Sequence, residues 1–347
     1  MDDKPFKNIT ILPLHYGKAP RWLFSRMKNL GKSILDVIID EFGVEGFFER
    51  IADPFWFQSL SNCLGYDWHS SGSTSVTLAA LREIFEENAE SYGIFIAGGK
   101  GKKGLATPKE IKIGCERLNC ENRIEDYVLA SRLAAKVDSS LVYDNFSLYC
   151  HFFIFSKNSF SVVQQGMFNE KDIAARFQWY SGKIKDYVNE PHVVTSDFHE
   201  KTLDLTYSKN SEVRNACVWL VREDFQKLYC LPKDHELKKE YLSEKVLKIL
   251  KDNRENIEKY EDLLLLKNVG RKTLRSLALI SKLIYDKEIY ERDPALFSFT
   301  VGGKDGTPYR INKRHYDEVI SQMRLIVENA KFEDKEKYKV LKRLAKL

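Results

Sequence analysis

Apolar residues recur along the chain at two spacings, which predict its helices and strands. In residues 30–48, apolar side chains fall three or four positions apart, the period of an amphipathic helix, and residues 77–89 repeat this pattern. Aromatic and β-branched runs over residues 149–155 and 160–166 are separated by four polar residues, which is typical of a β-hairpin. A short apolar run over residues 93–97 predicts a further strand. We therefore expect an α/β or α+β fold in which helices flank a mixed sheet.

Beyond about residue 235 the helical spacing takes over almost completely. It predicts helices over residues 237–250, 255–266, 273–285 and 316–330, and the glycines of residues 298–309 predict a loop. The chain is thus expected to hold two domains. One is a mixed α/β domain over residues 1–234, and the other is an all-helical domain over residues 235–347.

Composition narrows the class of protein. The 347 residues are 43% hydrophobic and 30% charged, and no apolar run approaches the roughly 18 residues that a membrane span needs. The start Met1-Asp2-Asp3-Lys4 lacks the features of a secretory signal. Six cysteines form no CxxC pair, which favours reduced thiols over a zinc site or a disulfide framework. We expect a cytoplasmic protein with no membrane association, and a homo-oligomer stays open.

The charge is unevenly divided. Residues 1–234 hold 29 Lys and Arg against 31 Asp and Glu, whereas residues 235–347 hold 26 against 19. A basic segment on a nearly neutral body is typical of nucleic-acid binding, although lysine-rich helix faces often serve only solubility. This pattern makes DNA a candidate partner.

Residues 263–280 combine an apolar helix end, a glycine turn and a new helix rich in cations, and residues 263–285 contain no acid. The pattern resembles a helix-hairpin-helix motif, whose turn offers a phosphate the backbone N–H groups and positive end of its second helix. The motif usually has glycine where this chain has Asn268, a residue type that tolerates left-handed backbone. The alternative is an ordinary connection between packed helices. The DNA contacts that the motif predicts are Lys267, Asn268, Gly270, Arg271, Lys272, Thr273 and Arg275.

Carboxylate, imidazole and amide side chains recur in the first domain. Asp67 and His69 are two positions apart, so on an extended segment both point the same way. His151 and Gln165 lie on neighbouring strands of the predicted hairpin, where they could face a common cleft. Any one of these residues alone has a structural explanation, such as a helix cap or a buried histidine. As a set they predict a site whose catalytic residues are Asp67, His69, Asp138, His151 and Gln165, with Gln164 as a further amide.

Such a set suits phosphodiester hydrolysis, which uses clustered carboxylates to hold divalent metal ions and cations to hold flanking phosphates. We expect Mg²⁺ or Mn²⁺ as cofactor. The predicted metal ligands are Asp67, Asp138, Glu190 and His192. The glycine- and lysine-rich residues 98–104 form a flexible loop that can approach a phosphate backbone, or else a soluble surface turn. The predicted phosphate contacts of this domain are Lys18, Lys100, Lys102 and Lys136.

Several segments together resemble the domain of unknown function 763 family, a group of uncharacterised, largely archaeal and bacterial proteins. They are LPLHYGKAPRWLF (12–24), DPFWFQ (53–58), DWHSSG (67–72), AGGKGK (97–102), AAKVD (134–138), VQQGM (163–167) and GGKDGTP (302–308). Tyr16 departs from the family's His-Gly-Gly-Lys-Ala-Pro pattern. The resemblance implies a DNA-processing nuclease with a ribonuclease-H-like first domain and a helical DNA-binding second domain.

The sequence thus predicts a metal-dependent deoxyribonuclease that acts in DNA repair on single-stranded, overhang or flap DNA. Two alternatives stay open: a DNA-binding protein without catalysis, and a glycosylase-like enzyme that flips a damaged base. The absence of a Gly-x-Ser-x-Gly elbow, a dinucleotide fingerprint and a kinase signature excludes the corresponding enzyme classes.

Overall fold

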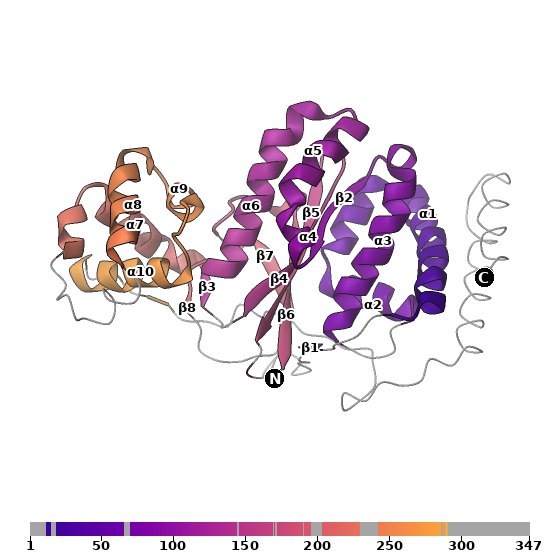
Figure 1. The fold of residues 1–347 in the computed structure, drawn as a ribbon, viewed down its shortest axis with the longest axis horizontal. Coiled ribbons are helices and arrows are strands. Elements are labelled where there is room, and N and C mark those ends of the chain that lie inside the picture. The colour runs from indigo at the N-terminus through magenta and orange to yellow at the C-terminus, as the bar shows by residue number, and fades with distance from the viewer. Residues whose placement is uncertain are drawn as a thin grey trace, which may run out of the picture.

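An antiparallel sheet forms the middle of the molecule (Figure 1). The computed structural model describes residues 12–14, 19–65, 70–143, 146–168, 170, 172–189, 191–195, 203–229, 242–285, 287 and 289–290. The strand order is β1-β6-β5-β4-β2, and β7 also pairs with β6. The strands are β1 (Leu12–Pro13), β2 (Phe95–Lys100), β4 (Ser147–Phe155), β5 (Phe160–Phe168), β6 (Ile173–Tyr180) and β7 (His192–Thr195). A separate pair joins β3 (Val142–Tyr143) to β8 (Leu203–Asp204).

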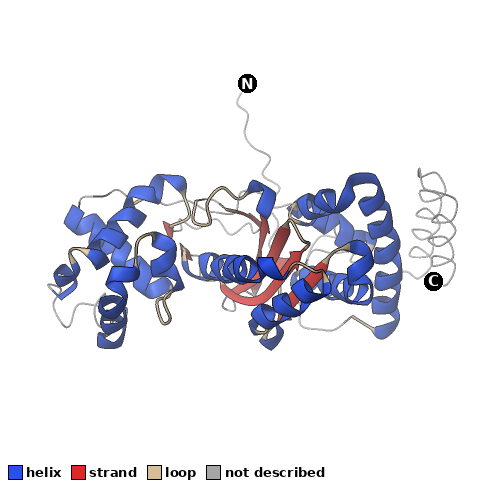
Figure 2. Cartoon of the chain, turned by 90° about the horizontal axis from the view of Figure 1, so that it is seen from above, coloured by secondary structure: helices blue, strands red, loops and turns tan. Residues whose placement is uncertain are grey.

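Helices cover both faces of this sheet, because its strands carry apolar side chains on both faces. Val163 of β5 packs with one side, formed by α1 (Arg21–Ile51), α2 (Pro54–Cys63) and α3 (Ser71–Tyr92). Its neighbour Val162 packs with the other side, formed by α5 (Thr107–Arg117) and α6 (Ile124–Ser140). Successive side chains of a strand point to opposite faces, so each strand contributes to two cores. Figure 2 shows the strands between these helices.

The remaining helices form a bundle beside α6 (Figure 1). They are α7 (Ser211–Arg222), α8 (Glu244–Asn253), α9 (Tyr260–Leu265) and α10 (Arg271–Tyr285). Short elements complete the described chain: α4 (Lys102–Leu105) and the 3₁₀ turns Glu121–Arg123, Ser181–Lys183, Ser208–Asn210, Phe225–Tyr229 and Arg254–Asn256. One buried apolar cluster runs from the sheet through α6 into α7 and α10. The bundle and the sheet therefore share a core.

The structure confirms an α+β fold and the hairpin predicted over residues 149–166, whose strands flank the turn at residues 156–159. The expected mixed sheet is wrong for the described strands, since each of their pairings is antiparallel. The predicted helices over residues 30–48 and 77–89 are parts of the longer α1 and α3. The helix predicted over residues 316–330 and the loop over 298–309 lie outside the described residues. Among the described helices, none combines the length and the apolar character that a membrane crossing requires.

Candidate functional site

Two of the predicted catalytic residues, Asp138 and His151, belong to one buried polar cluster between α6 and the sheet. We call it the α6 cluster, formed by Ser131, Asp138, His151, Gln164 and Trp179. His151 Nε2 lies 2.8 Å from the Ser131 hydroxyl oxygen, and His151 Nδ1 lies 2.6 Å from Gln164 Oε1. Asp138 Oδ2 accepts hydrogen bonds from the Gln164 amide and, at 2.9 Å, from the Trp179 indole. A hydrogen-bonded chain thus links Ser131 to Trp179.

The positions of the protons in this hydrogen-bonded series follow from its donor groups. The Gln164 amide nitrogen faces Asp138, so Gln164 Oε1 can only accept, and His151 Nδ1 must carry the proton. His151 Nε2 then accepts the Ser131 hydroxyl proton. Burial lowers the pKa of His151 to about 4, so the imidazole is neutral at pH 7. The α6 cluster is therefore a hydrogen-bonded polar network, which stabilises the contact of α6 with the sheet.

Gln165 lies on the opposite face of the sheet from His151. In the β4–β5 register His151 pairs with Gln164, and the next residue along β5 must point the other way. Gln165 donates to the Tyr149 hydroxyl and, at 3.0 Å, to the Ser71 carbonyl at the start of α3. No common cleft holds His151 and Gln165.

Around Gln165 lies a second polar cluster, which sequence reasoning missed. Its centre is Arg176 of β6, which is 1% exposed and lies over the Phe57 ring, with its guanidinium carbon 4.3 Å from the ring centre. Arg176 Nε donates to Thr74 Oγ1 and Nη2 donates to Gln58 Oε1, both at 2.9 Å. Burial lowers the pKa of Arg176 to about 9, so the side chain keeps its proton at pH 7. A cation inside the apolar run of residues 173–180 was the signal that could have pointed to it.

Several predicted residues cannot be placed. Lys18, Asp67, His69 and Glu190 lie outside the described residues, and for His192 only the backbone is described. Among the residues that are described, no three His, Cys, Asp or Glu side chains come close enough to hold a metal ion. Asp138 is 1% exposed, and its Oδ2 accepts from the Trp179 indole N–H, which can only donate. The metal site stays a prediction that involves residues outside the described ones.

The glycine-rich residues 98–104 are held rigidly, in contrast to the flexible loop expected. Gly98 N–H donates to Glu110 Oε2 at 2.7 Å, and Arg82 bridges Glu110 and the Gly98 carbonyl. Gly98 has a φ of +94°, and a Cβ there would lie 2.2 Å from the His151 carbonyl oxygen. The glycine is therefore required for close packing of β2 on β4. Lys100, Lys102 and Lys103 of this segment are exposed.

The predicted hairpin over residues 263–280 consists of α9, a turn and α10. Asn268 has a φ of +67°, the left-handed geometry expected of it, and a Cβ on Gly270 would meet nothing within 4 Å. A side chain at position 270 would therefore point into open space. Of the predicted DNA contacts, Lys267, Asn268 and Lys272 are exposed, Gly270, Arg271 and Arg275 are half-buried, and Thr273 is buried.

A family comparison covers both the sheet and this hairpin. The model of the family described as "Protein of unknown function (DUF763)" matches residues 8–311. The chain belongs to the DUF763 family. No curated protein and no solved structure matches it. The sheet, the α6 cluster and the hairpin all lie within the stretch that matches the DUF763 model.

In this DUF763 protein, two of the predicted phosphate contacts join the hairpin to α6. Lys136 Nζ donates to the Val269 carbonyl at 2.9 Å, and burial lowers the pKa of this lysine. Arg271 donates to the Ser139 carbonyl at 3.0 Å and to the Phe146 carbonyl at 2.5 Å. Both cations thus fix the turn against the end of α6, the helix that also carries Asp138.

Proposed function

We propose that this DUF763 protein is a metal-dependent deoxyribonuclease that acts on single-stranded, overhang or flap DNA, with a role in DNA repair. The observation that carries the DNA-binding part is the turn at residues 267–272. There an open Gly270, a left-handed Asn268 and the exposed Lys267 and Lys272 surround the positive end of α10. A phosphate is favoured at such a helix end, because the helix dipole and the lysines attract the same charge.

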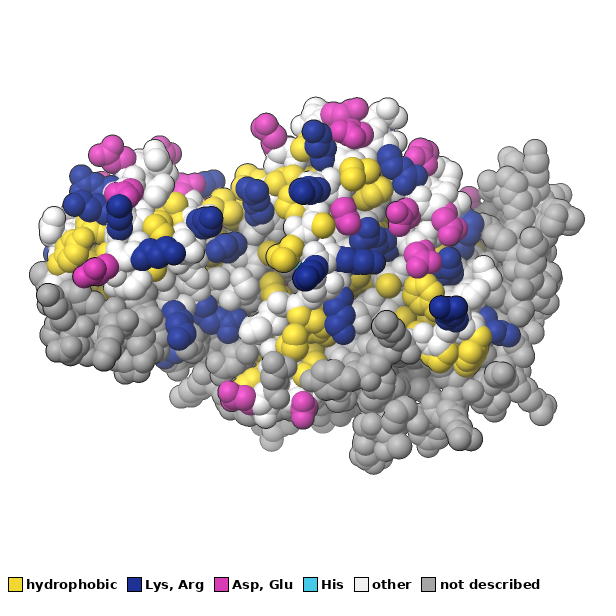
Figure 3. All heavy atoms as spheres, in the orientation of Figure 1, with side chains coloured by type: hydrophobic (Ala, Val, Ile, Leu, Met, Phe, Trp, Pro, Cys, Tyr) yellow, Lys and Arg dark blue, Asp and Glu magenta, His cyan; other side chains and the backbone are white. Residues whose placement is uncertain are grey.

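The surface charge supports this reading. Figure 3 shows Lys and Arg side chains spread across one face, from the bundle over α6 to the region of α4 and α3. Acidic side chains lie at the upper and lower margins of this face and also among the cations over α3. A strand of DNA laid along the face would meet cations at several successive phosphates, and such contacts bind without reading the base sequence.

Cleavage would need residues that hold a metal ion. Asp67, His69, Glu190 and His192 would supply metal ligands together with Asp138 of the α6 cluster, whereas Gln165 lies on the other face of the sheet. The expected role for Mg²⁺ or Mn²⁺ is to activate water and to stabilise the leaving oxygen. The ribonuclease-H-like arrangement gains no support from the antiparallel strand order.

The decisive experiment incubates the full chain with end-labelled single-stranded, overhang and blunt duplex DNA, in Mn²⁺ or Mg²⁺ and then in excess chelator. The proposal expects cuts in single strands and overhangs that the chelator abolishes. Lys272→Ala should weaken binding about equally for all sequences and reduce the salt slope by about one unit. Lys282→Ala, an exposed lysine at the other end of α10, is the matched control and should leave the slope unchanged.

A second candidate, a DNA-binding protein without catalysis, is favoured by the hydrogen bonds that Asp138 Oδ2 and His151 make inside the α6 cluster. Retention of DNA with no cut under any metal would favour it over the nuclease. A metal-independent abasic product would instead point to the glycosylase-like alternative. Failure to retain DNA at low ionic strength would refute all three.

A further inference from the structure

A pocket lies between the first turn of α1, one side of α3 and the segment that joins β2 to α4. Its volume is about 840 Å³, within the range of about 300–1,000 Å³ that is typical of small-ligand sites. Apolar side chains form its floor: Phe24 from α1, Val76 and Ala79 from α3, and Phe152 from β4. A flat, apolar group is therefore the natural occupant of its interior.

The rim of the pocket is strongly cationic on one side. Lys100, Lys102 and Lys103 line the side formed by β2 and α4, and all three are exposed. Among the described residues, none of these lysines has a carboxylate within ion-pair distance. Lys100 Nζ instead lies 5.4 Å from the centre of the Tyr149 ring, which holds its charge close to the pocket. An anion is thus favoured at this rim.

Most of the other charged side chains of the pocket are neutralised by ion pairs, and the charges that remain would orient a ligand. Arg82 pairs with Glu110 at 3.0 Å, and Glu83 pairs with Lys28 of α1 at 2.8 Å. Glu86, exposed on α3, also lines the pocket. A ligand with an anionic end and an uncharged flat end would place the anion at α4 and the flat end against α3.

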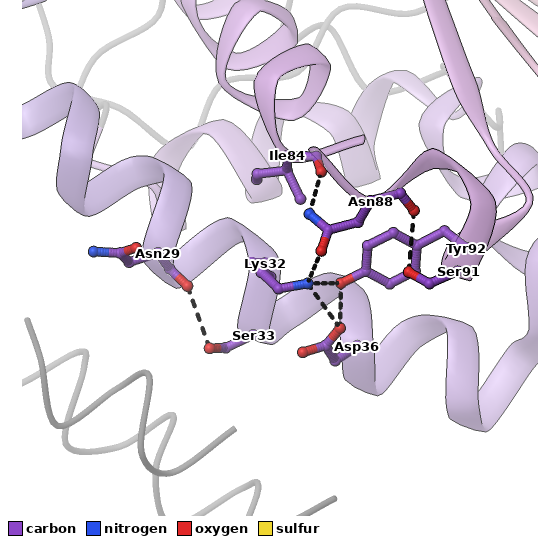
Figure 4. Close-up of polar contacts among 8 residues, drawn as sticks. All are labelled: Asn29, Lys32, Ser33, Asp36, Ile84, Asn88, Ser91 and Tyr92. Atoms are coloured by element: carbon purple, nitrogen blue, oxygen red, sulfur yellow. Dashed lines mark hydrogen bonds and ion pairs between the residues drawn. The ribbon is translucent and has the colours of Figure 1, made fainter. Parts of the chain in front are cut away.

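The walls of the pocket are fixed before any ligand arrives. The lysine rim rests on the rigid glycine segment described above, and Gly101 N–H donates to the Tyr149 carbonyl at 2.7 Å. Figure 4 shows how α1 and α3 are held together further along, where Lys32 donates to the Tyr92 hydroxyl at 2.6 Å and to Asn88 Oδ1 at 3.3 Å. Tyr92 in turn donates to Asp36. A preformed pocket loses little conformational entropy on binding.

We infer that this pocket takes one unpaired nucleotide of a DNA strand, with its base on the apolar floor and its phosphate at Lys100, Lys102 and Lys103. A base inside a duplex is stacked and paired, so only a single-stranded or flipped nucleotide can enter. Every base offers a flat face for stacking, so the pocket would not select a sequence. This inference rests on the proposed function. It explains why the proposed nuclease would prefer single strands to duplex DNA.

The test compares the affinity of the full chain for a labelled oligothymidylate and for a blunt duplex, by fluorescence anisotropy in chelator. Ala79→Trp fills the pocket without changing any charge. It should weaken single-strand binding about tenfold, as expected for the loss of one stacked base, and should change duplex binding less than about twofold. Lys102→Ala with Lys103→Ala should lower the single-strand salt slope by about 0.7, because both lysines hold the same phosphate.

The matched control is Lys109→Ala with Lys112→Ala, two exposed lysines on α5 that do not line the pocket. This pair should change neither affinity. A strand with 5-iodouracil should cross-link on irradiation to peptides that contain Phe24 or Phe152. Circular dichroism checks that each variant is folded, and the lysine pair keeps the test valid if Ala79→Trp is not.

Two results would overturn the inference. One is unchanged single-strand affinity in both pocket variants, or an equal loss for duplex. The other is displacement of the strand by free thymidine monophosphate at micromolar concentration, which would assign the pocket to a free nucleotide. In either case Lys272→Ala would still weaken DNA binding if the proposed function holds. Loss of the pocket inference is thereby separated from loss of the proposed function.

Discussion

Asp138 offers the sharpest test of whether the α6 cluster is structural or catalytic. Its carboxyl group is 1% exposed and accepts hydrogen bonds from two donors, the Gln164 amide and the Trp179 indole. Asp138→Ala removes the acceptor and leaves both donors buried. Asp138→Asn has nearly the same shape, and its one oxygen can take the place of Oδ2, which accepts from both donors.

The expected loss of folding free energy follows from the two buried donors. A buried donor without an acceptor costs about 1–3 kcal/mol, so Asp138→Ala should lower the free energy of unfolding by about 2–5 kcal/mol. Asp138→Asn should lower it by about 1–3 kcal/mol, because it can keep both bonds but buries an amide NH₂ donor where the carboxylate has Oδ1. Trp179→Phe removes the indole donor, so its effect and that of Asp138→Ala should be non-additive by about 1–3 kcal/mol.

The assay is urea unfolding of the wild type, the two Asp138 variants, Trp179→Phe and the double variant, in parallel with the DNA cleavage assay. If the role of Asp138 is structural, the Asp138 variants should lose DNA cleavage only in proportion to their loss of folded protein. A stability loss below about 0.5 kcal/mol in Asp138→Ala, together with abolished cutting, would refute the reasoning. Asp138 would then act on the substrate or its metal.

Three further predictions concern stability. His151 has a folded pKa of about 4, below its unfolded value of about 6.5, so its contribution is complete above pH 6.5 and is lost as the pH falls toward 4. His151→Gln should reduce the pH dependence of the free energy of unfolding by about 1.4 kcal/mol per pH unit in this range. Urea unfolding at several pH values measures this slope, and an unchanged slope would contradict the burial argument. Gly98→Ala, with its Cβ 2.2 Å from a backbone oxygen, should destabilise by more than about 2 kcal/mol. Gly93→Ala, also at positive φ but in open space, should cost only about 1–2 kcal/mol, and equal midpoints in thermal unfolding would show that the close contact is relieved. Arg271→Ala should cost about 1–3 kcal/mol because it breaks two bonds to backbone carbonyls. Lys272→Ala should change urea stability by less than about 0.5 kcal/mol, and similar losses in these two variants would refute the docking role of Arg271.

The sequence by itself determined the local elements. Aromatic runs on both sides of four polar residues were enough to place β4 and β5, because strand formation there depends on neighbours in the chain. The hairpin register is also local. With the turn at residues 156–159, position 151 must pair with position 164, so the sequence could have placed Gln164 rather than Gln165 beside His151.

The left-handed turn before α10 was likewise readable, since Asn268 and Gly270 are residue types that tolerate unusual backbone geometry. The exposed lysines beside it kept their predicted place at the surface. The sequence could not show which cations pack against the protein and which stay exposed, because Lys136 and Arg271 are basic residues in a sequence context similar to that of Lys267 and Lys272. Contacts between residues more than 120 positions apart decided that the first pair would meet backbone carbonyls.

Only the tertiary structure decided what the polar residues of the sheet do. Whether a buried Asp138 or Arg176 is a ligand, a catalyst or a structural partner depends on the groups that other elements bring within hydrogen-bond distance. Local sequence sets the conformation of a segment, but not the donors and acceptors that surround it after packing. The pocket at Lys100 has the same origin, since α1, α3, β2 and β4 each supply part of it and none of them forms it alone.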